Sequence, residues 1–153
     1  MHQLKMRPSL AMAVLLCLGF AHPVQAETQP QKLQAEKLAQ QLSEHYASKN
    51  LAKLDVASSA LNAIEVVYEH SLGGRPIERL QFKNFAELET WLQKKEIDSL
   101  PGRKSEALKH CQKGMCQYAI AGLLHNQLYL KGVSYVYLNG KPVVKALYLL
   151  DGD

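Results

Sequence analysis

The tightest constraint on how this chain folds is an Asn-Gly pair between two long apolar segments near its end. Residues 128–138 lead into Asn139-Gly140, and residues 141–150 follow. Asn-Gly suits a two-residue hairpin turn because both residues accept the positive φ of a type I′ turn. The sequence therefore predicts a long β-hairpin. Its expected pairs are Leu138 with Lys141, Tyr135 with Val144, and Tyr129 with Leu150.

Both faces of this predicted hairpin are largely apolar. One face carries Tyr129, Tyr135, Tyr137 and Tyr148, and the other carries Leu130, Val136, Val143, Leu147 and Leu149. Such a ribbon needs cover on both faces, from a helix on one side and from a cavity, a sheet or a partner chain on the other. The tyrosine face is a candidate contact for an apolar ligand, for another protein or for a second copy of the chain. The alternative is that these rings only stabilise the sheet by cross-strand packing.

The segments before the hairpin change between helical and strand periods. Residues 31–49 lack Gly and Pro, and their apolar stripe predicts an amphipathic helix. Residues 63–70 alternate with a period of two, and Gly73-Gly74 separates them from a second strand over 76–82. Asn84 then caps a helix that runs to about Lys95, and residues 116–124 alternate again. This order predicts one α+β domain, with a long N-terminal helix and a second helix packed on one curved antiparallel sheet.

The first 26 residues have the three parts of a secretory signal peptide. Lys5 and Arg7 precede an apolar run over 9–20, and Val24-Gln25-Ala26 offers small residues at the cleavage site. The run is too short to cross a bilayer as a mature helix. We therefore expect the mature protein to be residues 27–153, a single domain in the periplasm of a Gram-negative bacterium or secreted beyond it.

The mature chain retains 127 of the 153 residues and a net charge of +2, because the leader removes two of the 18 basic residues and none of the 14 acidic ones. This near-neutral balance argues against nucleic acid as a partner. No second apolar stretch has the length of a membrane span. Cys111 and Cys116 remain, and an even pair in an exported protein predicts a disulfide. No motif for a metal or another cofactor stands out.

The element order resembles the nuclear transport factor 2-like (cone-shaped, cystatin-like) superfamily. The resemblance is carried by Gly73-Gly-Arg-Pro-Ile-Glu78 before the capped helix and by Gly132-Val-Ser-Tyr-Val-Tyr-Leu-Asn-Gly-Lys141 at the end. Members fold a long N-terminal helix against a bent sheet, whose open end can hold a small molecule. Many exported members are non-catalytic binding or assembly modules, and others are isomerases, cyclases or dehydratases. The resemblance therefore implies a fold but leaves binding and catalysis open.

The segment Cys111-Gln-Lys-Gly-Met-Cys116 has the cysteine spacing of the disulfide-closed loop in periplasmic inhibitors of vertebrate-type lysozyme. The histidine and acidic residue that enter the enzyme's cleft in that family are absent here. Lys113 and Met115 are nevertheless candidate contact residues, because an apolar side chain on a charged loop is typical of a contact surface. Arg103, Lys104, Lys109 and Lys113 form a basic stretch that either meets an acidic protein or an anionic headgroup or is a solvated connection.

Tyr68 and His70 are the candidate catalytic pair, because alternation places both on the apolar face of the strand over 64–70. A histidine beside a tyrosine hydroxyl suits acid/base chemistry. The alternative is an exposed histidine at a strand end beside a turn.

Taken together, these features favour an exported, non-catalytic binding module. It would contact another exported protein or a small apolar ligand through the sheet face or the disulfide loop. One alternative is an inhibitor or immunity protein against a cell-wall-degrading enzyme. The other is a small cone-pocket enzyme of isomerase or hydrolase type that uses His70 and Tyr68.

Overall fold

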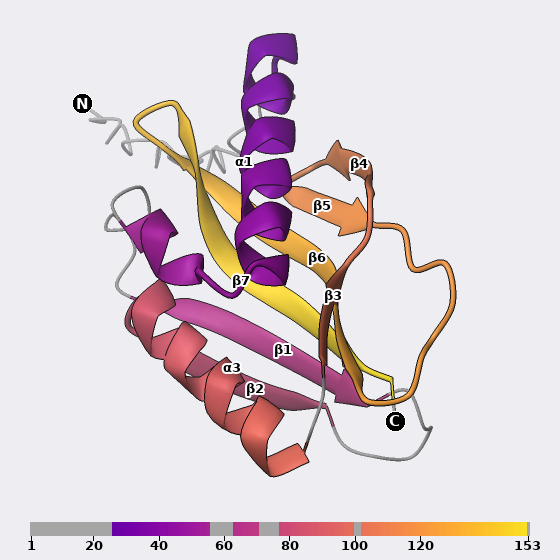
Figure 1. The fold of residues 1–153 in the computed structure, drawn as a ribbon. Helices are drawn as coiled ribbons and strands as arrows, with labels where there is room; N and C mark the ends of the chain where they lie inside the picture. The colour runs from indigo at the N-terminus through magenta and orange to yellow at the C-terminus, as the bar shows by residue number, and fades with distance from the viewer. Residues whose placement is uncertain (1–25, 56–62, 71–76, 100–101, 153) are drawn as a thin grey trace, which may run out of the picture.

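The computed structural model describes residues 26–55, 63–70, 77–99 and 102–152. The elements, in chain order, are α1 (Gln29–Ala47), η1 (Leu51–Leu54), β1 (Ile64–His70), β2 (Glu78–Phe82), α3 (Phe85–Ser99), β3 (Gly102–Ser105), β4 (Leu108–Gln112), β5 (Met115–Tyr118), β6 (Gln127–Leu138) and β7 (Lys141–Asp151) (Figure 1). The predicted signal peptide, except for Ala26, and the predicted turn at Gly73-Gly74 lie outside the described residues.

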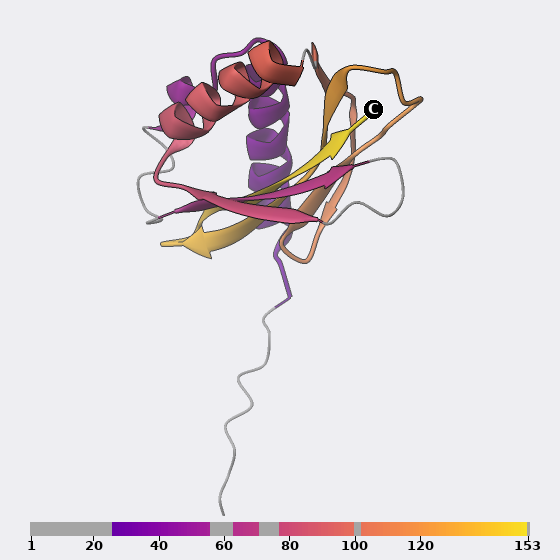
Figure 2. The ribbon, with the colours of Figure 1, turned by 90° about the horizontal axis from the view of Figure 1, so that it is seen from below.

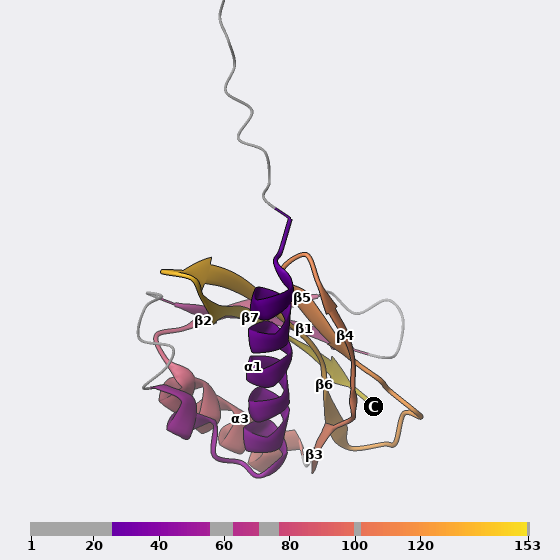
Figure 3. The same ribbon diagram turned by 90° about the horizontal axis from the view of Figure 1, so that it is seen from above.

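The strands form one sheet in the order β2-β1-β7-β6-β5-β4, and β3 pairs with β6 beyond the end of β5. The strands curve around α1 and α3, which lie on the same side of the sheet (Figures 2 and 3). The predicted α+β class, with two helices on one curved sheet, is confirmed. The sheet is mixed rather than wholly antiparallel, because β1 runs parallel to β7 and β3 runs parallel to β6. A tight turn forces two strands to be antiparallel only when they are neighbours in the chain.

Helix α1 begins at a capping box. The side-chain oxygen of Thr28 accepts from the backbone N–H of Gln31, and the side chain of Gln31 accepts from the backbone N–H of Thr28. The helix ends at Ala47 with Ser48 as its C-cap, and Lys49 follows with a φ of 58°. Its predicted apolar stripe is the buried face, with Ala35, Ala39, Leu42 and Tyr46 fully buried.

Helix α3 receives its N-terminal cap from two places in the chain. Asn84 Oδ1 accepts from the N–H of Glu87 at 2.9 Å, as the sequence predicts. The carboxylate of Asp55 accepts from the N–H groups of Phe85 at 2.6 Å and Ala86 at 3.0 Å. This second cap joins η1 to α3, because it satisfies helix donors from a segment 30 residues earlier in the chain.

The β6–β7 hairpin has the three predicted pairs, but it also contains two β-bulges. Lys131 is the extra residue in β6 between Leu130 and Gly132, and Lys145 is the extra residue in β7, opposite the step from Ser134 to Tyr135. One bulge on each strand restores the register, so pairs at both ends of the hairpin agree with a regular ladder. Between the bulges the pairing is shifted by one residue.

The bulges overturn the expectation that four tyrosines share one face. We call the face that packs against α1 and α3 the inner face, and the opposite one the outer face. Tyr135 and Tyr137 lie on the inner face, where they contact the main core, whereas Tyr129 and Tyr148 lie on the outer face. Each extra residue reverses the parity of the alternation along its strand, and the sequence pattern does not reveal it.

A third bulge lies at the sheet edge, in a region where the sequence pattern predicted only some of the strands. Lys109 is the extra residue of β4, between the pairs that Leu108 and His110 make with β5. Strands β3 and β4 were not predicted, and of the predicted strand over 116–124 only residues as far as Tyr118 are in β5. Residues 119–126 form a connecting loop instead.

Candidate functional site

A groove of about 490 Å³ lies on the outer face, where β4, β5, β6 and β7 meet the loop over 119–126. Its volume falls within the range of small-molecule sites in proteins. It is lined by Lys109, Met115, Gln117, Tyr118, Ala119, Ile120, Lys131, Gly132 and Tyr148. The lining is apolar over most of its area and carries two ammonium groups.

Strand alternation and one glycine shape the floor of this groove. Met115 and Gln117 point to the outer face because Cys116 and Tyr118, between and after them, face α1. A Cβ at Gly132 would lie 3.0 Å from the carbonyl oxygen of Cys116 and 3.7 Å from Sδ of Met115. Glycine at this position therefore leaves the floor open.

The two lysines of the groove are both bulge residues. Because a bulge re-aims side chains at a fixed point of a strand, Lys109 and Lys131 reach the same groove from β4 and β6. Lys131 Nζ lies 2.8 Å from Glu69 Oε2 on β1. Within the described part of the chain, Lys109 has no carboxylate within ion-pair distance. The groove therefore has positive charge at its edge and an apolar floor.

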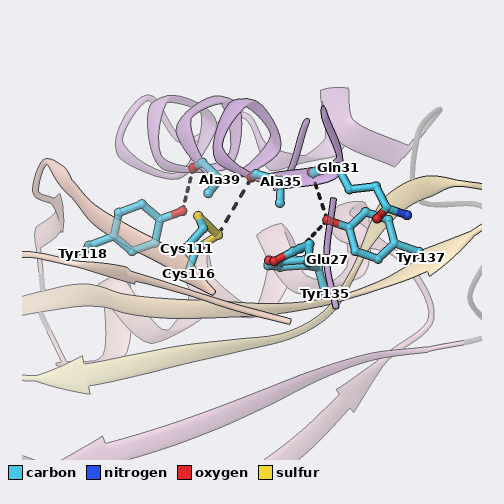
Figure 4. Close-up of a disulfide and its surroundings, with 9 residues drawn as sticks. All are labelled: Glu27, Gln31, Ala35, Ala39, Cys111, Cys116, Tyr118, Tyr135 and Tyr137. Atoms are coloured by element: carbon cyan, nitrogen blue, oxygen red, sulfur yellow. Dashed lines mark hydrogen bonds between the residues drawn. A yellow bond between two sulfur atoms is a disulfide. The ribbon is translucent and has the colours of Figure 1, made fainter. Parts of the chain in front are cut away.

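The predicted disulfide between Cys111 and Cys116 is present, and it faces the helix rather than the groove (Figure 4). The two cysteines are paired across β4 and β5, and Sγ of Cys116 lies 3.8 Å from the carbonyl oxygen of Ala35. The hydroxyl of Tyr118 donates to the carbonyl of Ala39 at 2.6 Å. The disulfide thus links β4 to β5 at the edge of the sheet, beneath α1.

Of the four residues between the cysteines, Lys113 and Gly114 form a two-residue turn, with φ of 49° and 77°. Its Gly114 carbonyl accepts from the N–H of Tyr135 at 2.9 Å, so the turn is bonded to β6. Lys113 is exposed at this turn, whereas Met115 lies on the groove floor. The candidate contact residues Lys113 and Met115 therefore do not form one loop tip.

Tyr135 and Tyr137 bind the residues at the start of helix α1 (Figure 4). Tyr135 donates to Glu27 Oε1 at 2.7 Å, and the Tyr137 hydroxyl contacts the same carboxylate and the carbonyl of Gln31. Burial, and then the Glu27 carboxylate, raise the pKa of Tyr135 to about 12. The same two causes raise the pKa of Tyr137. These tyrosines are thus an anchor for residue 27, the first residue after the predicted cleavage site.

The candidate catalytic pair meets a third polar residue that the sequence analysis did not identify. The Tyr68 hydroxyl donates to the Asp151 carboxylate, and His70 Nδ1 lies 3.8 Å from Asp151 Oδ2. The rings of Tyr68 and His70 are 4.7 Å apart and nearly perpendicular. Lys95 Nζ lies 4.5 Å above the Tyr68 ring. Tyr68 is fully buried on the inner face, away from the outer groove.

The basic stretch is not solvated along its whole length, because the Arg103 side chain lies inside the protein. This side chain is fully buried, and it lies 2.8 Å from Glu89 Oε1 and 3.0 Å from Glu96 Oε1 on α3. Lys104 is partly exposed and pairs with Glu106 at 2.9 Å. A buried guanidinium needs carboxylate partners, and α3 supplies them only once the fold is assembled. Sequence spacing gave no sign of these partners.

Comparison with known protein families, curated proteins and solved structures finds no match to this chain. Among the described residues, none of the helices has the length and hydropathy needed to cross a bilayer. The described side chains also include no cluster of three or more residues suited to hold a metal ion.

Proposed function

We propose that this protein is an exported, non-catalytic binding module that holds a small apolar ligand with a negatively charged group in the outer groove. The carrying observation is the combination of an apolar floor with Lys109 and Lys131 at one groove of about 490 Å³. Apolar pockets with a few placed polar groups are typical of small-molecule sites. A carboxylate, phosphate or sulfonate on the ligand would pair with the ammonium groups while its apolar part covers Met115 and Tyr148.

The disulfide and the leader support the exported location. A disulfide persists in the periplasm or outside the cell, and the N-terminal 26 residues have the pattern of a cleaved signal. The long helix against a curved sheet is in keeping with a resemblance to the nuclear transport factor 2-like superfamily. In that superfamily the ligand occupies the concave interior, whereas here we assign it to the opposite face.

Two observations make the other functions less favoured. The turn between Cys111 and Cys116 is bonded to β6, so it lacks the free loop that an inhibitor of the lysozyme-inhibitor type inserts into a cleft. Tyr68 is buried and His70 is partly buried, and both lie beside Asp151 and outside the groove.

Binding of anilinonaphthalene sulfonate tests the proposal, because this fluorescent probe joins an apolar ring system to one negative charge. We expect Met115→Glu and Lys109→Glu each to weaken its affinity about tenfold, since the first puts a carboxylate into the floor and the second reverses the charge at the edge. The matched controls are Leu33→Glu and Lys37→Glu, exposed positions on α1. Equal affinity in test and control variants would refute the groove as the site. If the native protein bound uncharged anilinonaphthalene as tightly as the sulfonate, this would refute the role of the lysines.

A further inference from the structure

The loop over 119–126 presents an unusual surface beside the groove. Its first six residues are Ala119-Ile-Ala-Gly-Leu-Leu124, which carry no polar side chain. Leu123 is 52% exposed and Leu124 is 55% exposed. In Figure 1 this loop, between β5 and β6, lies at the side of the molecule away from both helices. An apolar segment is thus held in solvent where the core does not use it.

Tyr129 forms hydrogen bonds to two backbone groups of this loop. The Tyr129 hydroxyl accepts from the N–H of Leu124 at 2.7 Å and donates to the carbonyl of Gly122 at 2.9 Å. Tyr129 itself is almost fully buried on the outer face. A rigid side chain therefore satisfies one backbone donor and one backbone acceptor on the two sides of Leu123. This reduces the cost of moving the loop into an apolar medium, where unpaired backbone groups are expensive.

Basic groups surround the base of the loop. Lys109 and Lys131 line the groove together with Ala119 and Ile120, and Lys104 Nζ lies 6.0 Å from the centre of the Tyr129 ring. Glu106 and Glu69 pair with Lys104 and Lys131, while Lys109 has no acidic partner among the described residues. Leu123 and Leu124 form the apolar tip of the loop. An apolar tip above lysines is complementary to a bilayer surface with anionic headgroups.

We infer that this loop is a docking element for an anionic lipid surface, with Leu123 and Leu124 inserted among the acyl chains and Lys109 at the headgroups. A protein partner is the less favoured occupant. The tip lacks the tyrosine, tryptophan and arginine that anchor protein interfaces, and its side chains have no hydrogen-bonding group to orient a partner. A lipid surface requires only apolar area and positive charge. The inference goes beyond the proposed function and stands whether or not the groove takes a ligand.

Sedimentation with vesicles tests this inference, using the mature protein and either phosphatidylglycerol or phosphatidylcholine vesicles. We expect the protein to sediment with the phosphatidylglycerol vesicles and to be released at high salt, because screening weakens the contribution of the lysines. The double variant Leu123→Ser, Leu124→Ser should bind about tenfold more weakly. The matched control is Leu33→Ser, Ile97→Ser, which removes two apolar side chains of 66% and 77% exposure on α1 and α3.

A second measurement does not depend on the folding of the serine variants. Leu123→Trp should give a blue-shifted emission with phosphatidylglycerol vesicles, after subtraction of the Trp91 signal, and Leu33→Trp should not shift. Binding that is equal for both vesicle types, or equal for the two double serine variants, would overturn the inference. So would the absence of vesicle binding combined with a photo-crosslink from position 123 to a protein. Loss of anilinonaphthalene sulfonate binding in the Met115→Glu variant with unchanged vesicle binding would leave the inference intact and separate it from the groove.

Discussion

At the scale of single residues, the charged groups inside the core connect elements that the apolar pattern alone would leave loosely joined. Arg103 on β3 contacts two carboxylates of α3, and one of these, Glu89, also accepts from the backbone N–H of Leu51 in η1. Lys49, which follows the end of α1, pairs with Glu96, and Lys49 Nζ lies 3.3 Å from Glu96 Oε1. This network joins α1, η1, α3 and β3 at one end of the sheet. The network specifies how these elements are oriented, because each hydrogen bond requires a defined direction between donor and acceptor, which apolar packing does not.

Removing the buried arginine should therefore destabilise the fold strongly. Arg103→Ala leaves Glu89 and Glu96 without their guanidinium, and we expect it to lower the free energy of unfolding by about 3–5 kcal/mol. Arg79→Ala is the control, because Arg79 pairs with Glu65 at 2.8 Å but its side chain is 66% exposed. An exposed pair is worth about 0–1 kcal/mol. Urea titrations of both variants measure the difference, and equal losses would contradict a structural role for the buried network.

At the scale of elements, the bulges decide which side chains meet the helices and which meet the groove. All three extra residues, at positions 109, 131 and 145, are lysines. A lysine suits a bulge on a partly apolar outer face, because its long stem covers apolar surface while the ammonium group remains in water. Two of these lysines reach the groove. The bulges thus both curve the sheet and supply the charge of the candidate site.

Deleting a bulge residue should be tolerated better than deleting its neighbour. Without Lys131, Leu130 can still pair with Leu149 and Gly132 with Tyr148, so every inner side chain stays on the inner face. Without Val133, the bulge is also consumed, but Gly132 moves to the inner position opposite Leu147. We expect this second deletion to cost about 1.5–3 kcal/mol more, the contribution of a buried valine.

Urea titration of the two deletion variants measures this difference. The Lys131 deletion should also weaken binding of anilinonaphthalene sulfonate, because it removes a lysine and straightens the groove wall. Equal destabilisation by the two deletions would show that the bulge itself, rather than the facing of the side chains, stabilises β6.

At the scale of the whole molecule, the sequence predicted the elements better than their relations. The 3.6-residue stripe of α1, the Asn84 cap and the Asn139-Gly140 turn are local signals, and each is present where expected. The parallel pairing of β1 with β7 and the contact of Arg103 with α3 join residues far apart in the chain, which periodicity does not encode. Of the candidate site, Met115 and Tyr148 were named as candidate contacts, and Lys109 was named as part of a basic stretch. Lys131 and the loop over 119–124 were not, because a bulge and a strand end leave no mark in an alternating pattern.

Alkaline pH should destabilise the molecule, because several of its core tyrosines must stay protonated. Burial raises the pKa of Tyr46 and Tyr118 above the ordinary value, and it raises that of Tyr135 to about 12. A group with a raised folded-state pKa stabilises fully below its unfolded pKa, near 10 for tyrosine, and loses this contribution as the pH rises toward the folded-state value. The free energy of unfolding should therefore fall above about pH 10, as urea titrations at increasing pH will measure.

Because lysines titrate in the same range, the double variant Tyr135→Phe, Tyr137→Phe isolates the anchor at Glu27. It should be less stable than the native chain near neutral pH, and its loss above about pH 10 should be smaller. An identical alkaline slope in both proteins would contradict the buried anchor.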